Sequence, residues 1–161
     1  MGSPRRRPPM NGSMFAYAGT IMLVLGGGEM MARPSRPPAP VEVSGCHAID
    51  GDTLRCGRVR VRLLGIDAAE QPGHCRQGRQ CAPGDPRAQR AALQRFSSTK
   101  LTVTPIKTDR WGRMVAVVRT TSGENLSCLM LRAGASYVAR WDDRDAILRS
   151  CRSAVREANH L

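Results

Sequence analysis

The sequence has few aromatic residues and no apolar run long enough to cross a membrane by itself. Phe, Trp and Tyr make up 4% of the 161 residues, so a folded core must be built from Val, Leu, Ile, Ala and Met. The uncharged, largely apolar run at residues 14–28 has 15 residues, whereas a free-standing transmembrane helix needs about 20. No internal repeat is visible. The length allows one ordinary domain and little more.

Acidic residues are scarce relative to basic ones. Lys and Arg number 25 against 13 Asp and Glu, which gives a formal net charge of +12. The part from Val41 onward carries 18 Arg and two Lys against 12 acids, so it is basic in its own right. A basic domain attracts polyanions such as nucleic acid. The alternative is an arginine-rich genome, since 23 of the 25 basic residues are Arg.

The first 40 residues do not look like a folded segment. A basic opening, RRRPP, precedes the apolar run, and the proline-rich stretch ARPSRPPAP follows it. A positive flank, a short apolar run and small residues form the pattern of a secretory signal or signal anchor. We therefore predict a signal at residues 1–32, a linker at 33–40 and the folded domain at 41–161. The protein is expected to be exported, periplasmic or secreted, with a membrane tether through residues 14–32 as the alternative to cleavage.

Six cysteines support export, because an even number outside the cytosol indicates disulfides. Cys46 and Cys56 lie symmetrically about Gly51, so a bend there would bring them opposite each other. The spacing then favours three pairs: Cys46–Cys56, Cys75–Cys81 and Cys128–Cys151. A metal site built from the middle pair and His74 is the alternative, although its spacing matches no common zinc pattern.

The residue patterns predict an α+β protein that is mostly β. Strands are expected at residues 41–49, 53–56, 58–66, 100–106 and 114–118, and helices at 85–96, 126–133 and 142–158. The third strand alternates Val59, Val61 and Leu63 with arginines, and Asp85 followed by Pro86 begins the first helix. The inward faces of the first and last helices are expected to carry Ala88, Ala92 and Phe96, and Ile147, Cys151, Ala154, Val155 and Ala158. Five short strands with three helices suit a closed barrel of the OB type, which often binds oligonucleotides.

Two aspartates are candidates for a metal site. The stretch DGDT at residues 50–53 contains an Asp-Gly turn, which explains Asp50 and Gly51 but not Asp52. Asp67 ends the third strand, so Asp52 and Asp67 meet at one end of the barrel if the first and third strands lie close. Two converging carboxylates repel each other unless a cation lies between them, and oxygen ligands select a hard cation, Ca²⁺ above all. The alternative is ordinary turn and loop chemistry.

Other candidates lie in three short segments. Arg62 projects from the polar face of the third strand, and Glu70 follows in the loop beyond it. Arg113 begins a strand after the turn DRWGR. Tyr137 and Trp141 are two of the chain's four Tyr and Trp residues. They either stack on bases or pack the last helix.

Together, IDGDT, RLLGID..E and D-R-aromatic-G-R resemble the motifs of the staphylococcal nuclease (thermonuclease) family of secreted, calcium-dependent nucleases. The resemblance covers about residues 43–141 and implies the OB-type barrel with three helices. It implies that calcium is held by Asp52, Asp67 and the backbone carbonyl of Ala68, phosphate by Arg62 and Arg113, and that Glu70 is the catalytic carboxylate. The family cuts the bond to the 5′ oxygen of DNA and RNA and leaves 3′-phosphate ends.

The chain departs from the family pattern near the predicted site. Ala69 and the alanine before it stand where the family often has Thr-Pro ahead of its glutamate. Trp111 replaces the usual Tyr, and Tyr137 and Trp141 are near matches to the family's base-stacking tyrosines. We expect substrate contacts from these three aromatic residues together with Arg62 and Arg113. The additional cysteines suggest a disulfide-braced version.

The sequence thus predicts an exported, monomeric, Ca²⁺-dependent nuclease acting on DNA or RNA. The first alternative is a non-catalytic nucleic-acid-binding module with the OB-type barrel, which is expected to have lost a residue of the ionic centre. The second is a secreted, disulfide-stabilised binding or structural protein, whose acids and arginines would be ordinary surface residues.

Overall fold

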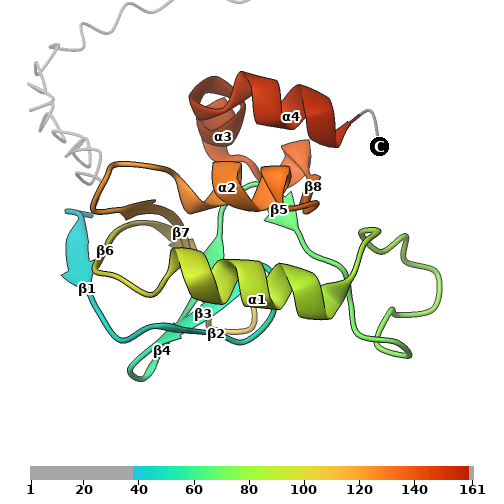
Figure 1. The fold of residues 1–161 in the computed structure, drawn as a ribbon, viewed down its shortest axis with the longest axis horizontal. Helices are drawn as coiled ribbons and strands as arrows, with labels where there is room; N and C mark the ends of the chain where they lie inside the picture. The colour runs from blue at the N-terminus through green and yellow to red at the C-terminus, as the bar shows by residue number, and fades with distance from the viewer. Residues whose placement is uncertain (1–37, 160–161) are drawn as a thin grey trace, which may run out of the picture. The chain divides into compact units, whose positions relative to one another are not determined.

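Residues 38–159, which the computed structural model describes, are built around a six-stranded sheet (Figure 1). Its strands are β1 (Val41–Val43), β2 (His47–Ala48), β3 (Thr53–Cys56), β4 (Val59–Leu63), β6 (Leu101–Thr108) and β7 (Met114–Thr120). Their order is β1-β6-β7-β4-β3-β2, in which β4 and β7 are parallel and the other neighbours antiparallel. A second sheet pairs β5 (Ile66–Asp67) with β8 (Ser136–Tyr137).

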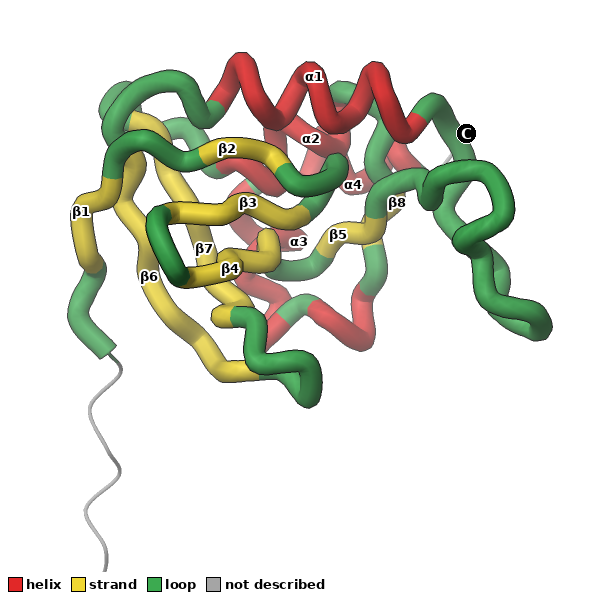
Figure 2. Tube along the Cα trace, turned by 90° about the horizontal axis from the view of Figure 1, so that it is seen from below, coloured by secondary structure: helices red, strands yellow, loops and turns green. Residues whose placement is uncertain are grey.

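The strand expected at residues 41–49 is broken into two. Gly45, with a φ of +67°, lies between β1, which pairs with β6, and β2, which pairs with β3. These two short strands are the opposite edges of the sheet. Because a link of three residues joins the edges, the sheet curls into a half barrel (Figure 2). The α+β class is confirmed, but the five-stranded count is wrong.

The interior of the curl is aliphatic, as the low aromatic content requires. Leu54, Val61 and Leu63 on the facing strands β3 and β4 are at most 2% exposed. Val59 was expected to share that face, yet its side chain is 45% exposed because it stands at the hairpin turn. The strand expected at residues 58–66 also ends early. Gly65, with a φ of +73°, separates β4 from β5.

Four α-helices replace the three that were expected. They are α1 (Pro86–Phe96), α2 (Leu126–Arg132), α3 (Ala146–Ser150) and α4 (Arg152–Ala158), with short 3-10 turns η1 (Ala139–Trp141) and η2 (Asp143–Asp145). The helix expected at 142–158 starts late because the Asp142 carboxylate accepts the backbone N–H groups of Ile147 and Leu148. It is then interrupted at Cys151, whose φ of −143° is not helical.

The first helix begins as predicted, and of its expected inward residues Ala92 is buried and Phe96 is partly buried against the core, whereas Ala88 is not. The Asp85 carboxylate accepts the N–H groups of the first turn, and Pro86 is the first helical residue. The buried positions are Gln89, Ala92 and Leu93, while Ala88 is exposed. The helix packs against β2 and α2, and α2, α3 and α4 lie together on one side of it (Figure 1).

Three disulfides brace the fold, and all six cysteines are paired. They are Cys46–Cys56, Cys75–Cys81 and Cys128–Cys151, the three pairs that the spacing favours. The first spans the bend between β2 and β3, and the last ties α2 to the junction of α3 and α4. The middle pair closes a short exposed loop, so its sulfurs are not available as zinc ligands beside His74.

The predicted signal at residues 1–32 lies outside the described residues, as does most of the predicted linker. Among residues 38–159, none of the helices has the length and apolar character that a membrane crossing needs.

Candidate active site

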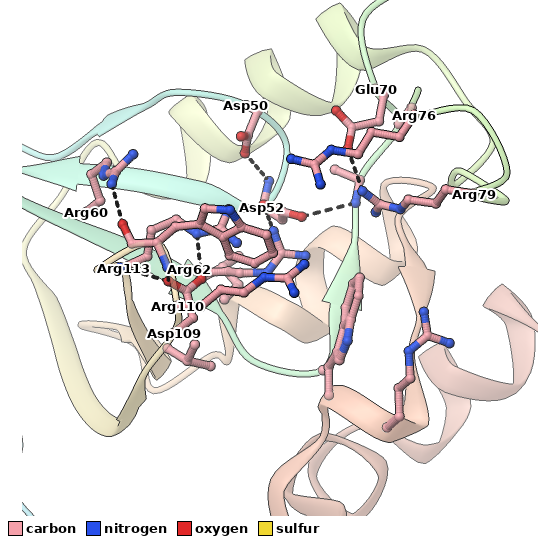
Figure 3. A pocket seen from close by; sticks show the side chains of 18 of the residues that line it. Asp50, Asp52, Arg60, Arg62, Glu70, Arg76, Arg79, Asp109, Arg110 and Arg113 are labelled. Carbon is pink, nitrogen blue, oxygen red and sulfur yellow. Dashed lines mark hydrogen bonds and ion pairs between the residues drawn. The ribbon is translucent and has the colours of Figure 1, made fainter. Parts of the chain in front are cut away.

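An open cleft of about 920 Å³ lies where the β2–β3 bend, the loop after β5, the β6–β7 turn and η1 meet (Figure 3). Its basic lining residues are Arg60, Arg62, Arg76, Arg79, Lys107, Arg110, Arg113 and Arg140. Its acidic ones are Asp50, Asp52, Glu70 and Asp109. The excess of positive charge makes the cleft attractive to a polyanion.

The bend between β2 and β3 needs a glycine at its centre. A Cβ on Gly51 would lie 2.7 Å from the Cβ of Ala68 and 2.9 Å from the Cβ of Gln89, so a larger residue does not fit. The Asp50 carboxylate accepts the backbone N–H of Asp52 at 3.0 Å and closes the turn. The bend therefore holds Asp52 directly beside the segment that carries Asp67.

Asp52 and Asp67 are brought together around one guanidinium. Arg62 Nη1 donates to Asp52 Oδ1 at 2.8 Å, and Arg62 Nη2 lies 3.3 Å from Asp67 Oδ1. Asp52 and Asp67 are 4% and 6% exposed. Burial raises the pKa of Asp52 to about 6, despite the opposing charge of Arg62, and the neighbouring Asp50 adds to the rise. The pair is thus a buried acidic centre that a further positive charge would stabilise.

Arg79 supplies such a charge in the structure, and nothing in the sequence pattern pointed to it. It lies in the loop that Cys75–Cys81 closes. Its Nη2 donates to Asp67 Oδ2 at 2.6 Å, and its Nη1 lies 3.2 Å from Glu70 Oε1. Glu70 is therefore joined to the acidic centre through Arg79. Glu70 and Arg79 lie on the same side of the cleft (Figure 3).

The donor set of this centre suits a hard divalent cation. Asp52 Oδ2 lies 3.3 Å from the backbone nitrogen of Ala68, so its carboxylate adjoins the peptide that links Asp67 to Ala68. The atoms that could bind a metal here are carboxylate and carbonyl oxygens, which are the ligands that Ca²⁺ prefers. The described part of the chain holds no group of three His, Cys, Asp or Glu side chains able to bind a metal. Ca²⁺ usually has about six to eight oxygen ligands, so it would also need carbonyl, water or substrate oxygens here.

Asp109 positions Arg113 on the wall of the cleft that faces Glu70 and Arg79 (Figure 3). The Asp109 carboxylate accepts the backbone N–H groups of Trp111 and Arg113, each at 2.9 Å, and its Oδ2 lies 2.7 Å from Arg113 Nε. Burial opposes ionisation of Asp109, but the hydrogen bonds from Arg113 and Trp111 outweigh it and lower its pKa. Trp111 is 48% exposed, with the guanidinium of Arg110 4.1 Å from its ring centroid.

The two aromatic residues near the third expected helix are used differently. Trp141 lines the cleft, with the Arg62 guanidinium 4.9 Å from its ring centroid. Tyr137 is not among the lining residues. Its hydroxyl donates to Asp142 Oδ2 at 2.9 Å, and burial together with this bond raises its pKa to about 12.

A buried glutamine fixes the backbone just before Glu70. Gln89 is 2% exposed; its Oε1 accepts the N–H of Ala69 at 2.8 Å, and its Nε2 donates to the carbonyl of Gly134 at 2.7 Å. Helix α1 thus anchors the loop that presents Glu70. The sole sequence signal was the position of Gln89, one helical turn before the predicted inward residue Ala92.

Comparison with known proteins places the chain among nucleases. Residues 60–160 match a family described as staphylococcal nuclease homologue. Over 115 residues, covering 69% of each chain, the sequence is 31% identical to a protein from Escherichia coli O157:H7 named uncharacterized endonuclease. It is 30% identical, over the same share, to a protein of that name from Escherichia coli.

Proposed function

The chain belongs to the staphylococcal nuclease family, and from this membership we propose that it is an exported, Ca²⁺-dependent nuclease. It would hydrolyse phosphodiester bonds of DNA, RNA or both and leave 3′-phosphate ends. One observation carries the proposal: Asp52, Arg62, Glu70 and Arg113 line a single basic cleft, and the buried Asp67 is paired with two of its arginines, Arg62 and Arg79.

The two arginines have donors left for a phosphate. A guanidinium has five N–H groups, and the bonds of Arg62 to Asp52, Asp67 and the Ile66 carbonyl account for three. Arg113 bonds Asp109 through Nε, and within residues 38–159 its terminal nitrogens have no hydrogen-bond partner. Arg62 can therefore offer two N–H groups, and Arg113 four, to phosphate oxygens, where negative charge grows during attack by water.

Asp52, Asp67 and the carbonyl of Ala68 would hold the Ca²⁺ ion, which when bound withdraws negative charge from a phosphate oxygen. Glu70 would accept the proton of the attacking water. Two contacts hold Glu70 in position, because Gln89 fixes the preceding peptide and Arg79 binds the carboxylate. Trp111 and Trp141 would contact the bases or sugars on either side.

Location and assembly are also part of the proposal. Three disulfides support export, since disulfides persist in oxidising compartments. Residues 1–32 would direct export, and residues 14–32 would be the tether if the signal is kept. We propose that the exported domain acts as a monomer.

Metal-dependent cleavage tests the proposal. Residues 35–161, which include all the described residues, are incubated with labelled single-stranded DNA and RNA in Ca²⁺ or in a chelator. We expect cleavage in Ca²⁺, none in the chelator, and products that a polymerase extends only after a phosphatase has removed the 3′-phosphate. Tight binding without cleavage in Ca²⁺ would instead identify a non-catalytic nucleic-acid-binding module.

Replacing Arg79 by Gln is expected to strengthen calcium binding. The guanidinium occupies Asp67 Oδ2, an oxygen that a cation needs, so its removal takes away both a competitor and a repelling charge. Arg79 is about one third exposed, which screens the effect; we expect a Kd three- to tenfold lower, roughly 1 kcal/mol. Isothermal titration with Ca²⁺ measures it.

Arg76→Gln is the matched control for Arg79. Arg76 lies in the same loop and lines the same cleft, but within the described residues it forms no ion pair. Its loss should change the Kd by much less. Weaker calcium binding by Arg79→Gln would mean that Arg79 supports the ion rather than competes with it.

A further inference from the structure

The hairpin formed by β3 and β4 carries one arginine that lines the cleft, Arg60, and two that lie outside its lining, Arg55 and Arg58. Arg60 lies two residues before Arg62 on β4, so both project from the outer face of the sheet while Val61 between them is buried. Arg55 lies directly opposite Arg60 on β3. Arg58 is exposed in the turn that joins the strands. We call Arg55, Arg58 and Arg60 the hairpin arginines.

The hairpin arginines lack opposite charges. None of them forms an ion pair within residues 38–159, although Arg62, Arg79 and Arg113 all do. Like charges placed directly across two strands, as in Arg55 and Arg60, destabilise a sheet. An anionic partner bound across this pair would neutralise the repulsion.

This surface is continuous with the cleft. Arg60 lines the cleft, and its Nη2 donates to the backbone carbonyl of Trp111 at 2.6 Å, which holds its side chain against the β6–β7 turn. In Figure 3, Arg60 lies on the side of Arg62 away from Glu70. Alternate residues of a strand are about 6.7 Å apart, so Arg62 and Arg60 present two cations in succession along one line out of the cleft.

We propose that the hairpin arginines bind the backbone of a single strand of nucleic acid as it leaves the cleft past Arg62. The inference rests on the proposed nuclease function and extends it to the length and form of the substrate. Exposed Trp111 beside the track favours a single strand, because unstacked bases can lie on an aromatic ring while a duplex keeps its bases paired inside. The surface adds affinity for long strands without contacting the reacting phosphate.

Kinetics on short and long substrates test the proposal. The double variant Arg55→Gln/Arg58→Gln changes two residues outside the cleft lining. For a trinucleotide we expect kcat and KM to stay at the wild-type values. For a 20-nucleotide single strand we expect KM to rise about tenfold. The slope of log affinity against log salt should flatten by about 1.4, as for two lost contacts to single-strand phosphates.

The control is Arg149→Gln/Arg156→Gln, which removes the same charge from exposed sites on α3 and α4. It should leave the KM for the long strand unchanged. An unchanged KM in the hairpin variant, or an equal loss in the control, would overturn the proposal. So would an equal loss of affinity for a duplex of the same length.

Binding without catalysis separates this inference from the nuclease proposal. Fluorescence anisotropy with the labelled 20-nucleotide strand in a chelator does not require cleavage. If no substrate is cut but the hairpin variant binds the strand about tenfold more weakly, the proposed activity fails and the surface stands. If wild-type protein cuts both substrates and the variant binds the strand normally, the surface fails alone.

Discussion

Arg62→Ala is expected to lower the rate of cleavage at least about 100-fold, as for removal of one transition-state donor. In the structure this guanidinium bonds Asp52 and Asp67 and still has two N–H groups for a phosphate. The substitution removes those donors from the site where negative charge develops. Single-turnover rates at saturating Ca²⁺ measure the loss.

The same substitution should also cost stability, in a way that reports on the acidic pair. Without Arg62, the buried carboxylates of Asp52 and Asp67 lose the cation between them, and breaking a buried pair typically costs about 3–5 kcal/mol. A ligand that binds only the folded state restores stability. We therefore expect urea unfolding in a chelator to show a loss of about 3 kcal/mol, and saturating Ca²⁺ to recover part of it.

Arg113→Ala provides the comparison that separates the two effects. Arg113 is paired with Asp109 and contacts neither member of the acidic pair, so its loss should reduce the rate by a similar factor without making stability more dependent on calcium. Arg149→Ala, on the exposed surface of α3, should change neither property. Rates near the wild-type value in Arg62→Ala or Arg113→Ala would refute their assignment to the phosphate.

Glu70→Gln is expected to reduce kcat by about 10²- to 10⁴-fold, the usual contribution of a general base. The amide has nearly the shape of the carboxylate and keeps an oxygen that can accept from Arg79, which lies 3.2 Å from Glu70 Oε1. It cannot take a proton from water. The loss should therefore appear in kcat, with Ca²⁺ affinity and thermal stability close to the wild-type values.

Glu157→Gln serves as the control for charge, because Glu157 is exposed on α4 and distant in sequence from the cleft-lining segments. It should cut at the wild-type rate. A Glu70→Gln enzyme that loses less than about tenfold would exclude Glu70 as the base and leave it the role of organising the loop.

Local sequence patterns predicted the elements whose signals are local. The Asp85–Pro86 start of α1 and the alternation around Val61 are determined by residues that are neighbours in the sequence. The break in the expected last helix was not predictable in this way. It arises because Asp142 binds the N–H groups of α3 and because the chain turns at Cys151, where a disulfide ties it to α2.

The residues of the candidate site also fall into those that a local sequence motif predicts and those that only the folded chain brings together. The approach of Asp52 to Asp67 is predicted from the sequence on the premise that the first and third expected strands lie close, and that premise is wrong, because β3 lies between β2 and β4. The two residues meet because β3 pairs with β4, with the Leu63 N–H donating to the Asp52 carbonyl at 2.9 Å, and both carboxylates contact Arg62. Arg79 and Gln89 carry no motif. The first reaches the centre through a disulfide-closed loop and the second through the packing of α1, so both contacts arise only in the folded chain.

The contact between Gln89 and Ala69 makes these two positions epistatic. Many family members have proline where Ala69 stands, and proline has no N–H to donate. Here the amide of a helix side chain immobilises the loop that a pyrrolidine ring would otherwise stiffen. Ala69→Pro alone would leave the buried Gln89 Oε1 without a hydrogen-bond donor and lower the free energy of unfolding by about 1–3 kcal/mol. Exchanging the Gln89–Ala69 hydrogen bond for a proline at position 69 therefore requires substitutions at both positions, and a substitution at only one of them is expected to destabilise the loop.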